Sequence, residues 1–180
     1  LRRQGSFLRK NDSMNADAHL SLEALNHSDL KKAMACFATG IAIVTTRYRD
    51  ADFGMTCNSF NTVSLEPAMV LWSVQKTSSS HEAFVRSDGY TVSILGADQE
   101  DIAHRFARGA PAERFDGLPI KRLANGRTVI AGSVAWFDCA LETAVAAGDH
   151  NVLIGRVLDF ASNDGHPLGY VHGKFIDMEG

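Results

Sequence analysis

The sequence has no long hydrophobic run, few cysteines and no excess of charge of one sign. No apolar run approaches the about 18 residues that a membrane-spanning helix requires. The formal net charge is −3, from 18 basic and 21 acidic residues, so the composition does not indicate binding to nucleic acid or to an anionic membrane. The apolar fraction of 45% is ordinary for a soluble globular protein.

The cysteines lack the spacing of a metal site or of a disulfide framework. Cys36, Cys57 and Cys139 are scattered, no C-x-x-C pair occurs, and no two histidines stand four residues apart. The pattern indicates a reduced protein of the cytoplasm, and no metal site is predicted.

The usual catalytic motifs are also absent. The sequence contains no G-x-S-x-G motif, no phosphate-binding P-loop and no G-x-G-x-x-G fingerprint, and no pair of carboxylates stands out for acid–base catalysis. If the protein is an enzyme, a bound cofactor is therefore expected to supply the reactivity.

The length of 180 residues predicts one domain with a substantial core. We expect residues 1–27 to form an N-terminal arm, either disordered or an added leader, because its first residues are polar, basic and without periodicity. The arm lacks the apolar centre of a secretion signal. Residues 28–180 are expected to form the domain.

The hydrophobic pattern predicts a mainly β domain with about three helices. Ser28 is expected to cap the first helix, whose apolar face would hold Leu30, Met34 and Phe37. Two short helices are expected after residues 78–80 and after residue 98. Six or seven strands are expected, at 41–48, 68–74, 90–95, 134–145, 151–160 and 167–176, with short candidates at 118–123 and 128–131. Because most of them are joined by hairpins, the pattern favours an antiparallel barrel with the helices outside it.

A polar segment, Gly54 to Pro67, lies between two apolar strand-like runs. One interpretation is a strand with a solvated face. The other is the wall of a ligand site, in which hydroxyls and an amide would donate and accept hydrogen bonds while two sulfur side chains contact a ring. The residues concerned are Met55, Thr56, Cys57, Asn58, Ser59 and Ser64.

Two further segments have both a structural and a functional interpretation. Lys76 to Ser80 either caps a helix or binds a phosphate through hydroxyls, helix N–H groups and the Lys76 ammonium. Gly148-Asp149-His150 is either a hairpin turn or a place where His150 contacts a second substrate. His104 falls on a predicted helix and is expected at the surface.

Several segments, taken in their order along the chain, resemble one known family. They are Phe37 to Thr46, Gly54 to Phe60, Val63 to Pro67, Ser78-Ser79, Ala97 to Glu100, Gly148 to His150 and Gly155 to Val157. From about Leu30 to Phe175 the chain is similar to the short-chain flavin reductases, the NAD(P)H:flavin oxidoreductases that serve two-component monooxygenases.

The resemblance implies an antiparallel Greek-key split β-barrel that binds FMN or FAD and forms a homodimer. Met55 to Asn58 would line the isoalloxazine ring, Ser59 would also belong to the cofactor site, and Ser64 and Leu65 would approach the ring. Lys76, Ser78 and Ser79 would hold the phosphate. His150 would face the nicotinamide, and Phe175, or Tyr170, would close the site.

The activity that the resemblance implies is hydride transfer from NADH or NADPH to flavin N5, after which reduced flavin passes to a monooxygenase. The alternative is a flavin-binding protein, or a flavoprotein oxidoreductase that retains its flavin. The sequence does not decide between FMN and FAD, or between NADH and NADPH.

Overall fold

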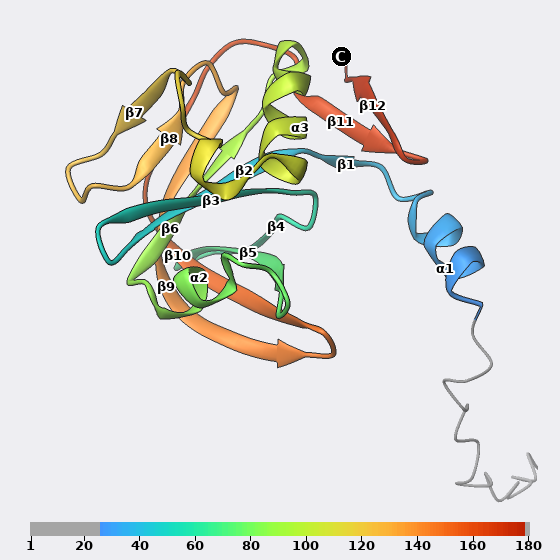
Figure 1. Ribbon diagram of the computed structural model, residues 1–180, viewed down its shortest axis with the longest axis horizontal. Coiled ribbons are helices and arrows are strands. Elements are labelled where there is room, and N and C mark those ends of the chain that lie inside the picture. Colours follow the sequence, from blue (N-terminus) through green and yellow to red (C-terminus); the bar gives the residue numbers. More distant parts are fainter. Residues whose placement is uncertain (1–25, 179–180) are drawn as a thin grey trace, which may run out of the picture.

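Seven strands form one antiparallel sheet in the order β3-β2-β6-β9-β10-β5-β4 (Figure 1). The structure is a computed structural model that describes residues 26–178. The strands of this sheet are β2 (Ala42–Tyr48), β3 (Ala51–Cys57), β4 (Asn61–Leu65), β5 (Ala68–Gln75), β6 (Gly89–Ile94), β9 (Ala135–Ala147) and β10 (His150–Ser162). The mainly β, antiparallel architecture predicted from the hairpin pattern is therefore confirmed.

A short connection forces this sheet to roll into a barrel. Strands β3 and β4 lie at opposite edges, which in a flat sheet of seven strands would be about 29 Å apart. Only residues 58–60 join them, and the four peptide units from Cys57 to Asn61 span at most about 14 Å. The sheet must curl until its edges approach each other. The Ser59 hydroxyl secures the connection by accepting a hydrogen bond from the Ser73 amide of β5 at 3.0 Å.

Two hydrophobic cores lie on the two faces of the rolled sheet. The inner core centres on the fully buried Trp72, Phe84 and Tyr90, whose rings pack edge to face. The outer core includes Ile43 and Phe106 and lies between the sheet and its helical cover. Strands that contact both cores read as continuous apolar runs in the sequence.

Three α-helices and two small sheets surround the barrel (Figure 1). The helices are α1 (His27–Met34), α2 (His81–Arg86) and α3 (Glu100–Arg108), with 3-10 turns at Ala97–Gln99 and Pro111–Glu113. One small sheet pairs β7 (Ile120–Arg122) with β8 (Thr128–Ile130). The other has the order β1-β11-β12 and contains Thr39–Gly40, Leu168–Val171 and Lys174–Asp177.

The first helix differs from its prediction at both ends. Asn26, not Ser28, caps it, because the Asn26 side chain accepts hydrogen bonds from the amides of Ser28 and Asp29. The helix ends at Met34, so Phe37 lies outside it, and none of its residues is buried. The helix begins at His27, next to the predicted boundary between the arm and the domain, and residues 1–25 lie outside the described part.

Two predicted strands are each divided in the structure. The 54–67 segment contributes to both β3 and β4, and the 167–176 run is the β11–β12 hairpin. Residues 26–178 consequently hold twelve strands rather than six or seven. Within those residues, no helix is long and apolar enough to cross a membrane.

A buried ion pair attaches the β7–β8 hairpin to the barrel. The Arg127 and Asp138 side chains are 5% and 6% exposed, and Arg127 Nε donates to Asp138 Oδ1 at 2.7 Å. Asn125 donates to the second carboxylate oxygen at 2.6 Å, so both oxygens of Asp138 are satisfied. Arg127 Nη1 also donates to the exposed Asp88 carboxylate at 2.9 Å, so Asp138 is the buried one of its two carboxylate partners.

We predict that Asp138→Ala lowers the free energy of unfolding by about 3 kcal/mol in urea denaturation, because the buried Arg127 guanidinium keeps only the exposed Asp88 as a carboxylate partner. Glu142→Ala is the matched control. It breaks the 2.6 Å pair with Arg156, whose partners are 41% and 49% exposed, and should cost less than about 1 kcal/mol. Equal losses in the two variants would contradict this role of the buried pair.

Candidate functional site

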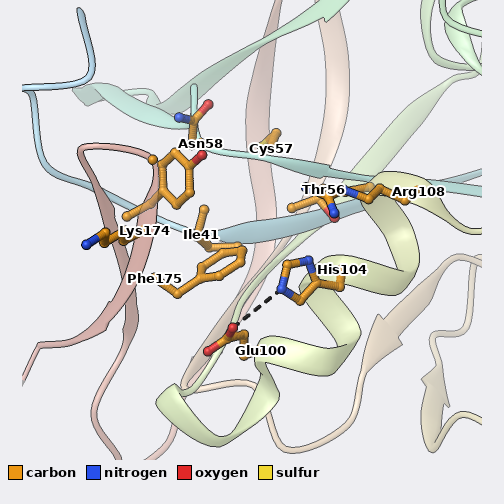
Figure 2. Close-up of a pocket in the computed structure, with 12 residues that line it drawn as sticks. Ile41, Thr56, Cys57, Asn58, Glu100, His104, Arg108, Lys174 and Phe175 are labelled. Carbon is orange, nitrogen blue, oxygen red and sulfur yellow. Dashed lines mark ion pairs between the residues drawn. The ribbon is translucent and has the colours of Figure 1, made fainter. Parts of the chain in front are cut away.

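A cleft of about 580 Å³ opens between the edge strand β3, helix α3 and the β11–β12 hairpin (Figure 2). Its walls come from segments that are far apart in the sequence: Thr56 to Asn58 on β3 and just beyond it, one face of α3, and Tyr170 with Phe175 near the C-terminus. A concave site of this size is large enough for a small-molecule ligand.

The β3 wall offers backbone groups as well as side chains, because β3 is an edge strand. The Gly54 carbonyl points away from the sheet and accepts a hydrogen bond from Arg114 at 2.6 Å. Backbone direction alternates along a strand, so the amide and carbonyl groups of Thr56 face the same open edge, and β3 ends one residue later at Cys57. This edge can donate and accept hydrogen bonds without disturbing the sheet.

Helix α3 is held against β3 by two contacts that fix the width of the cleft. Gly54 allows the close approach, since a Cβ atom there would lie 2.6 Å from the Phe106 ring. The Thr56 hydroxyl donates to the Ala103 carbonyl at 2.6 Å. Ile102, Ala103 and Phe106 are thereby buried under the helix.

The opposite face of α3 points into the cleft. Glu100, His104 and Arg108 recur at intervals of four residues and all line it (Figure 2). His104 Nε2 lies 3.4 Å from Glu100 Oε1. The imidazole also packs edge to face on Phe175, with 5.0 Å between ring centroids.

The third wall is the β11–β12 hairpin, which contributes aromatic rings and a cation. The Tyr170 and Phe175 ring centroids are 5.3 Å apart, and both rings pack against the outer core. Lys174 lies beside them at the edge of the cleft (Figure 2). The cleft therefore combines stacking surfaces with hydrogen-bonding groups and positive charge.

Four of the predicted site residues meet in this cleft: Thr56, Cys57, Asn58 and Phe175. Their sequence neighbours Met55 and Ser59 do not line the cleft. Met55 packs against the inner core, and the Ser59 hydroxyl is engaged by the Ser73 backbone.

The predicted phosphate and nicotinamide residues lie elsewhere in the single chain. Lys76 Nζ donates to the Gly148 carbonyl at 2.6 Å, and the Ser78 hydroxyl accepts from the Ser80 amide at 3.3 Å. Ser79 lines a separate shallow pocket beside Phe53. His150 begins β10 at the end of a hairpin, with Nδ1 2.7 Å from the Asp149 carboxylate.

Ser64 and Leu65 line a different, apolar groove on β4, β5, β9 and β10. They are on the edge of the sheet opposite to β3, because residues 58–60 carry the chain from one edge to the other. The polar 54–67 segment is thus not one continuous wall.

Sequence reasoning missed the contribution of α3 to the cleft. His104 was expected simply at the surface, and Arg108 was not considered. The signal available in the sequence was the i, i+4, i+8 spacing of Glu100, His104 and Arg108 on the face opposite to the apolar residues.

Cys57 does not supply a nucleophile to the cleft, because its side chain is buried in the inner core. Burial raises the pKa of its thiol to about 12, so the group stays neutral near pH 7.

Residues 34–179 match the family described as flavin reductase like domain. The chain is 40% identical over 150 residues to the FMN reductase (NADH) SmoA of Agrobacterium fabrum, which covers 83% of this chain and 85% of SmoA. It is 38% identical over 157 residues to the reductase component of the flavin-dependent trigonelline monooxygenase of Acinetobacter baylyi, covering 86% of this chain but 50% of that relative.

Solved structures that are similar to this chain also include flavin reductases. The flavin reductase PheA2 is similar over 87% of this chain and 100% of its own, with a TM-score of 0.80 and 33% identity. The NADH:FAD oxidoreductase SgcE6 of Streptomyces globisporus, solved in complex with NAD and FAD fragments, is similar over 84% of this chain and 92% of its own, with a TM-score of 0.80 and 31% identity.

We predict that DTNB at pH 8 reacts rapidly with one thiol per folded chain. Cys36 is exposed, whereas burial raises the pKa of both Cys57 and Cys139 to about 12 from an ordinary value of 9.0. The other two thiols should react only after denaturation. Cys36→Ser should remove the rapid phase, and a rapid phase that persists in this variant would contradict the burial of Cys57 and Cys139.

Proposed function

The chain belongs to the flavin reductase-like family, and from this premise we propose that it reduces FMN or FAD with NADH or NADPH and supplies reduced flavin to a partner monooxygenase. The observation that carries the proposal is the cleft between β3, α3 and the β11–β12 hairpin. Relatives of this chain are named as NADH-dependent flavin reductases and as reductase components of monooxygenases.

The groups that line the cleft fit a flavin. An isoalloxazine ring needs a flat apolar contact along its faces and hydrogen bonds along its polar edge. Tyr170 and Phe175 supply aromatic surface, while the side-chain amide of Asn58 and the outward backbone groups of Thr56 supply donors and acceptors. These groups would hold the polar edge of a bound ring.

The bound flavin supplies the hydride acceptor, so the reaction needs no acid or base from the protein in that step. The residues of this chain contribute position instead. Holding two reactants at about 3–3.5 Å in the correct orientation accounts for several kcal/mol of a barrier. Backbone donors on the rigid edge of β3 also act as fixed dipoles beside the ring, which favours a gain of negative charge there.

The exposure of the cleft favours release of the flavin over its retention. Asn58, His104 and Lys174 are all exposed, and no lid covers the cleft within residues 26–178. A reductase that serves a separate monooxygenase must let its product leave. The alternative, a flavoprotein that retains its flavin, would need a more enclosed site.

We further propose a homodimer, because an apolar groove of about 640 Å³ lies open on β4, β5, β9 and β10. Its rim carries Val63, Leu65, Leu158 and Phe160, which are 47%, 90%, 49% and 66% exposed. Such a contiguous apolar surface marks an interaction site on a globular protein. A second copy would cover it with an identical groove.

The assignment of His150 to the nicotinamide and of Lys76, Ser78 and Ser79 to a phosphate remains part of this proposal. These residues lie outside the cleft of their own chain: Lys76 and His150 are at the turn that joins β9 to β10, and Ser79 lines the pocket beside Phe53. A cytoplasmic location is likewise proposed, supported by three free thiols.

The proposal is tested by following NADH absorbance after mixing the protein with excess FMN, FAD or riboflavin. We expect catalytic oxidation of NADH, many turnovers per chain, and loss of the flavin on ultrafiltration. Absence of turnover with every pair of flavin and NADH or NADPH would refute the reductase activity. Flavin that stays with the protein on the filter would favour the retained-flavin alternative.

His150→Ala in the same assay tests the nicotinamide contact. We expect the KM for NADH to rise by much more than the dissociation constant for FMN, which fluorescence quenching measures separately. If both constants change equally, His150 has no specific place beside the donor.

Phe160→Asp tests the proposed dimer surface. Light scattering after size exclusion should give twice the chain mass for the natural protein and one chain mass for this variant, since a carboxylate cannot be buried unpaired in an apolar interface. Ala112→Asp, which adds the same charge to an exposed turn, should remain dimeric. A monomer in all three samples would contradict the dimer.

A further inference from the structure

Two cations line the cleft without a carboxylate partner. Arg108, at the end of α3, and Lys174, at the start of β12, are both exposed in its walls. Among residues 26–178, the ion pairs involve neither of them. Their charge is therefore available to a ligand.

A role in stabilising the helix does not account for the position of Arg108. Basic residues in the last turn of a helix interact favourably with its dipole, and both Arg105 and Arg108 stand there in α3. Arg105 is tied to the next loop, because its guanidinium donates to the Glu113 and Asp116 carbonyls. Arg108 instead lies beside Thr56 in the cleft (Figure 2).

The acidic residue of the cleft does not neutralise Arg108. Glu100 is eight residues earlier on α3, about 12 Å along the helix axis, and lies within 3.4 Å of His104. The α3 wall is therefore polarised, with its positive end beside the β3 edge and its acidic end remote from it.

Positive charge and aromatic surface occur together in this cleft. Tyr170 and Phe175 form a ring pair next to Lys174, and Arg108 stands on the opposite wall (Figure 2). Aromatic rings stack on heterocyclic bases, and guanidinium and ammonium groups bind phosphate oxygens. The combination is suited to a nucleotide rather than to a nucleoside.

We propose that Arg108 binds a phosphoryl group of a nucleotide in the cleft, that Lys174 on the opposite wall adds a second cation for the same ligand, and that the two make the protein discriminate nucleotides from the corresponding nucleosides. The inference rests on the proposed function, since both flavin nucleotides and nicotinamide dinucleotides carry phosphate. Arg108 thereby gives α3 a role in ligand specificity, in addition to its packing against the barrel.

The test compares ligands that differ only in phosphate. Dissociation constants are measured on the flavin-free protein for FMN against riboflavin, by fluorescence quenching, and for adenosine monophosphate against adenosine, by calorimetry. Arg108→Gln and Lys174→Gln should each weaken the phosphorylated member of at least one pair by about three- to tenfold, and leave its partner unchanged. The pair that responds identifies the flavin or the donor as the source of the phosphate.

Arg108→Lys should keep most of the discrimination, because it keeps the charge. Arg86→Gln is the matched control, because it removes one positive charge from α2, where Arg86 pairs with Glu82. It should change neither the FMN-to-riboflavin ratio of dissociation constants nor the ratio for adenosine monophosphate and adenosine. The proposal is overturned if Arg108→Gln leaves both ratios unchanged, or if it weakens the two members of a pair equally.

These outcomes are separable from the reductase activity itself. Turnover of NADH by the natural protein with riboflavin or FMN tests the activity and does not depend on the ratios. If the natural protein turns over NADH but Arg108→Gln leaves the nucleotide-to-nucleoside ratios of dissociation constants unchanged, only the phosphate site is refuted. If those ratios change in Arg108→Gln but the natural protein does not turn over NADH, only the reductase activity is refuted.

Discussion

The structure depends on one geometric constraint, the short connection between the two edges of the main sheet. Residues 58–60 must carry the chain from β3 to β4, and a flat sheet would place those strands too far apart. The sheet therefore rolls, and the outward edge of β3 stays free of strand partners beyond β2. The same constraint that closes the barrel leaves backbone hydrogen-bonding groups available at Thr56, where a ligand can use them.

The remaining walls of the cleft are fixed by contacts that keep α3 and the C-terminal hairpin in place. Gly54 and Thr56 bring α3 onto β3, and the buried outer core under Phe106 holds it there. The polar face of the helix is then left toward the cleft as a consequence of helical periodicity. Packing and recognition thus use opposite faces of the same nine residues.

Local pattern was sufficient to predict the elements of this fold but not the way they pair. The β-branched run before Tyr48 and the apolar run after Pro67 predicted strands because periodicity and propensity depend on neighbours in sequence. The break at residues 58–60 was missed, since polar composition does not show where an edge strand ends. Strand order places Thr56 on β3 and Ser64 on β4, at the two edges of the sheet, so a role for Ser64 beside the flavin stays a prediction. His104 and Arg108 were missed because their role depends on a hairpin more than sixty residues away.

The β11–β12 hairpin has a consequence for divergence among related proteins. The hairpin is anchored by its pairing with β1 and by Leu168, Tyr170 and Phe175, which pack against the outer core. Lys174 is exposed beside these anchors, so its substitution leaves the barrel and its cores intact. Gly173 has a φ of 78° and resists substitution, whereas neutral drift can sample new side chains at Lys174 while the fold is kept. Preference for one nucleotide over another can then change in evolution by steps that selection for folding does not remove.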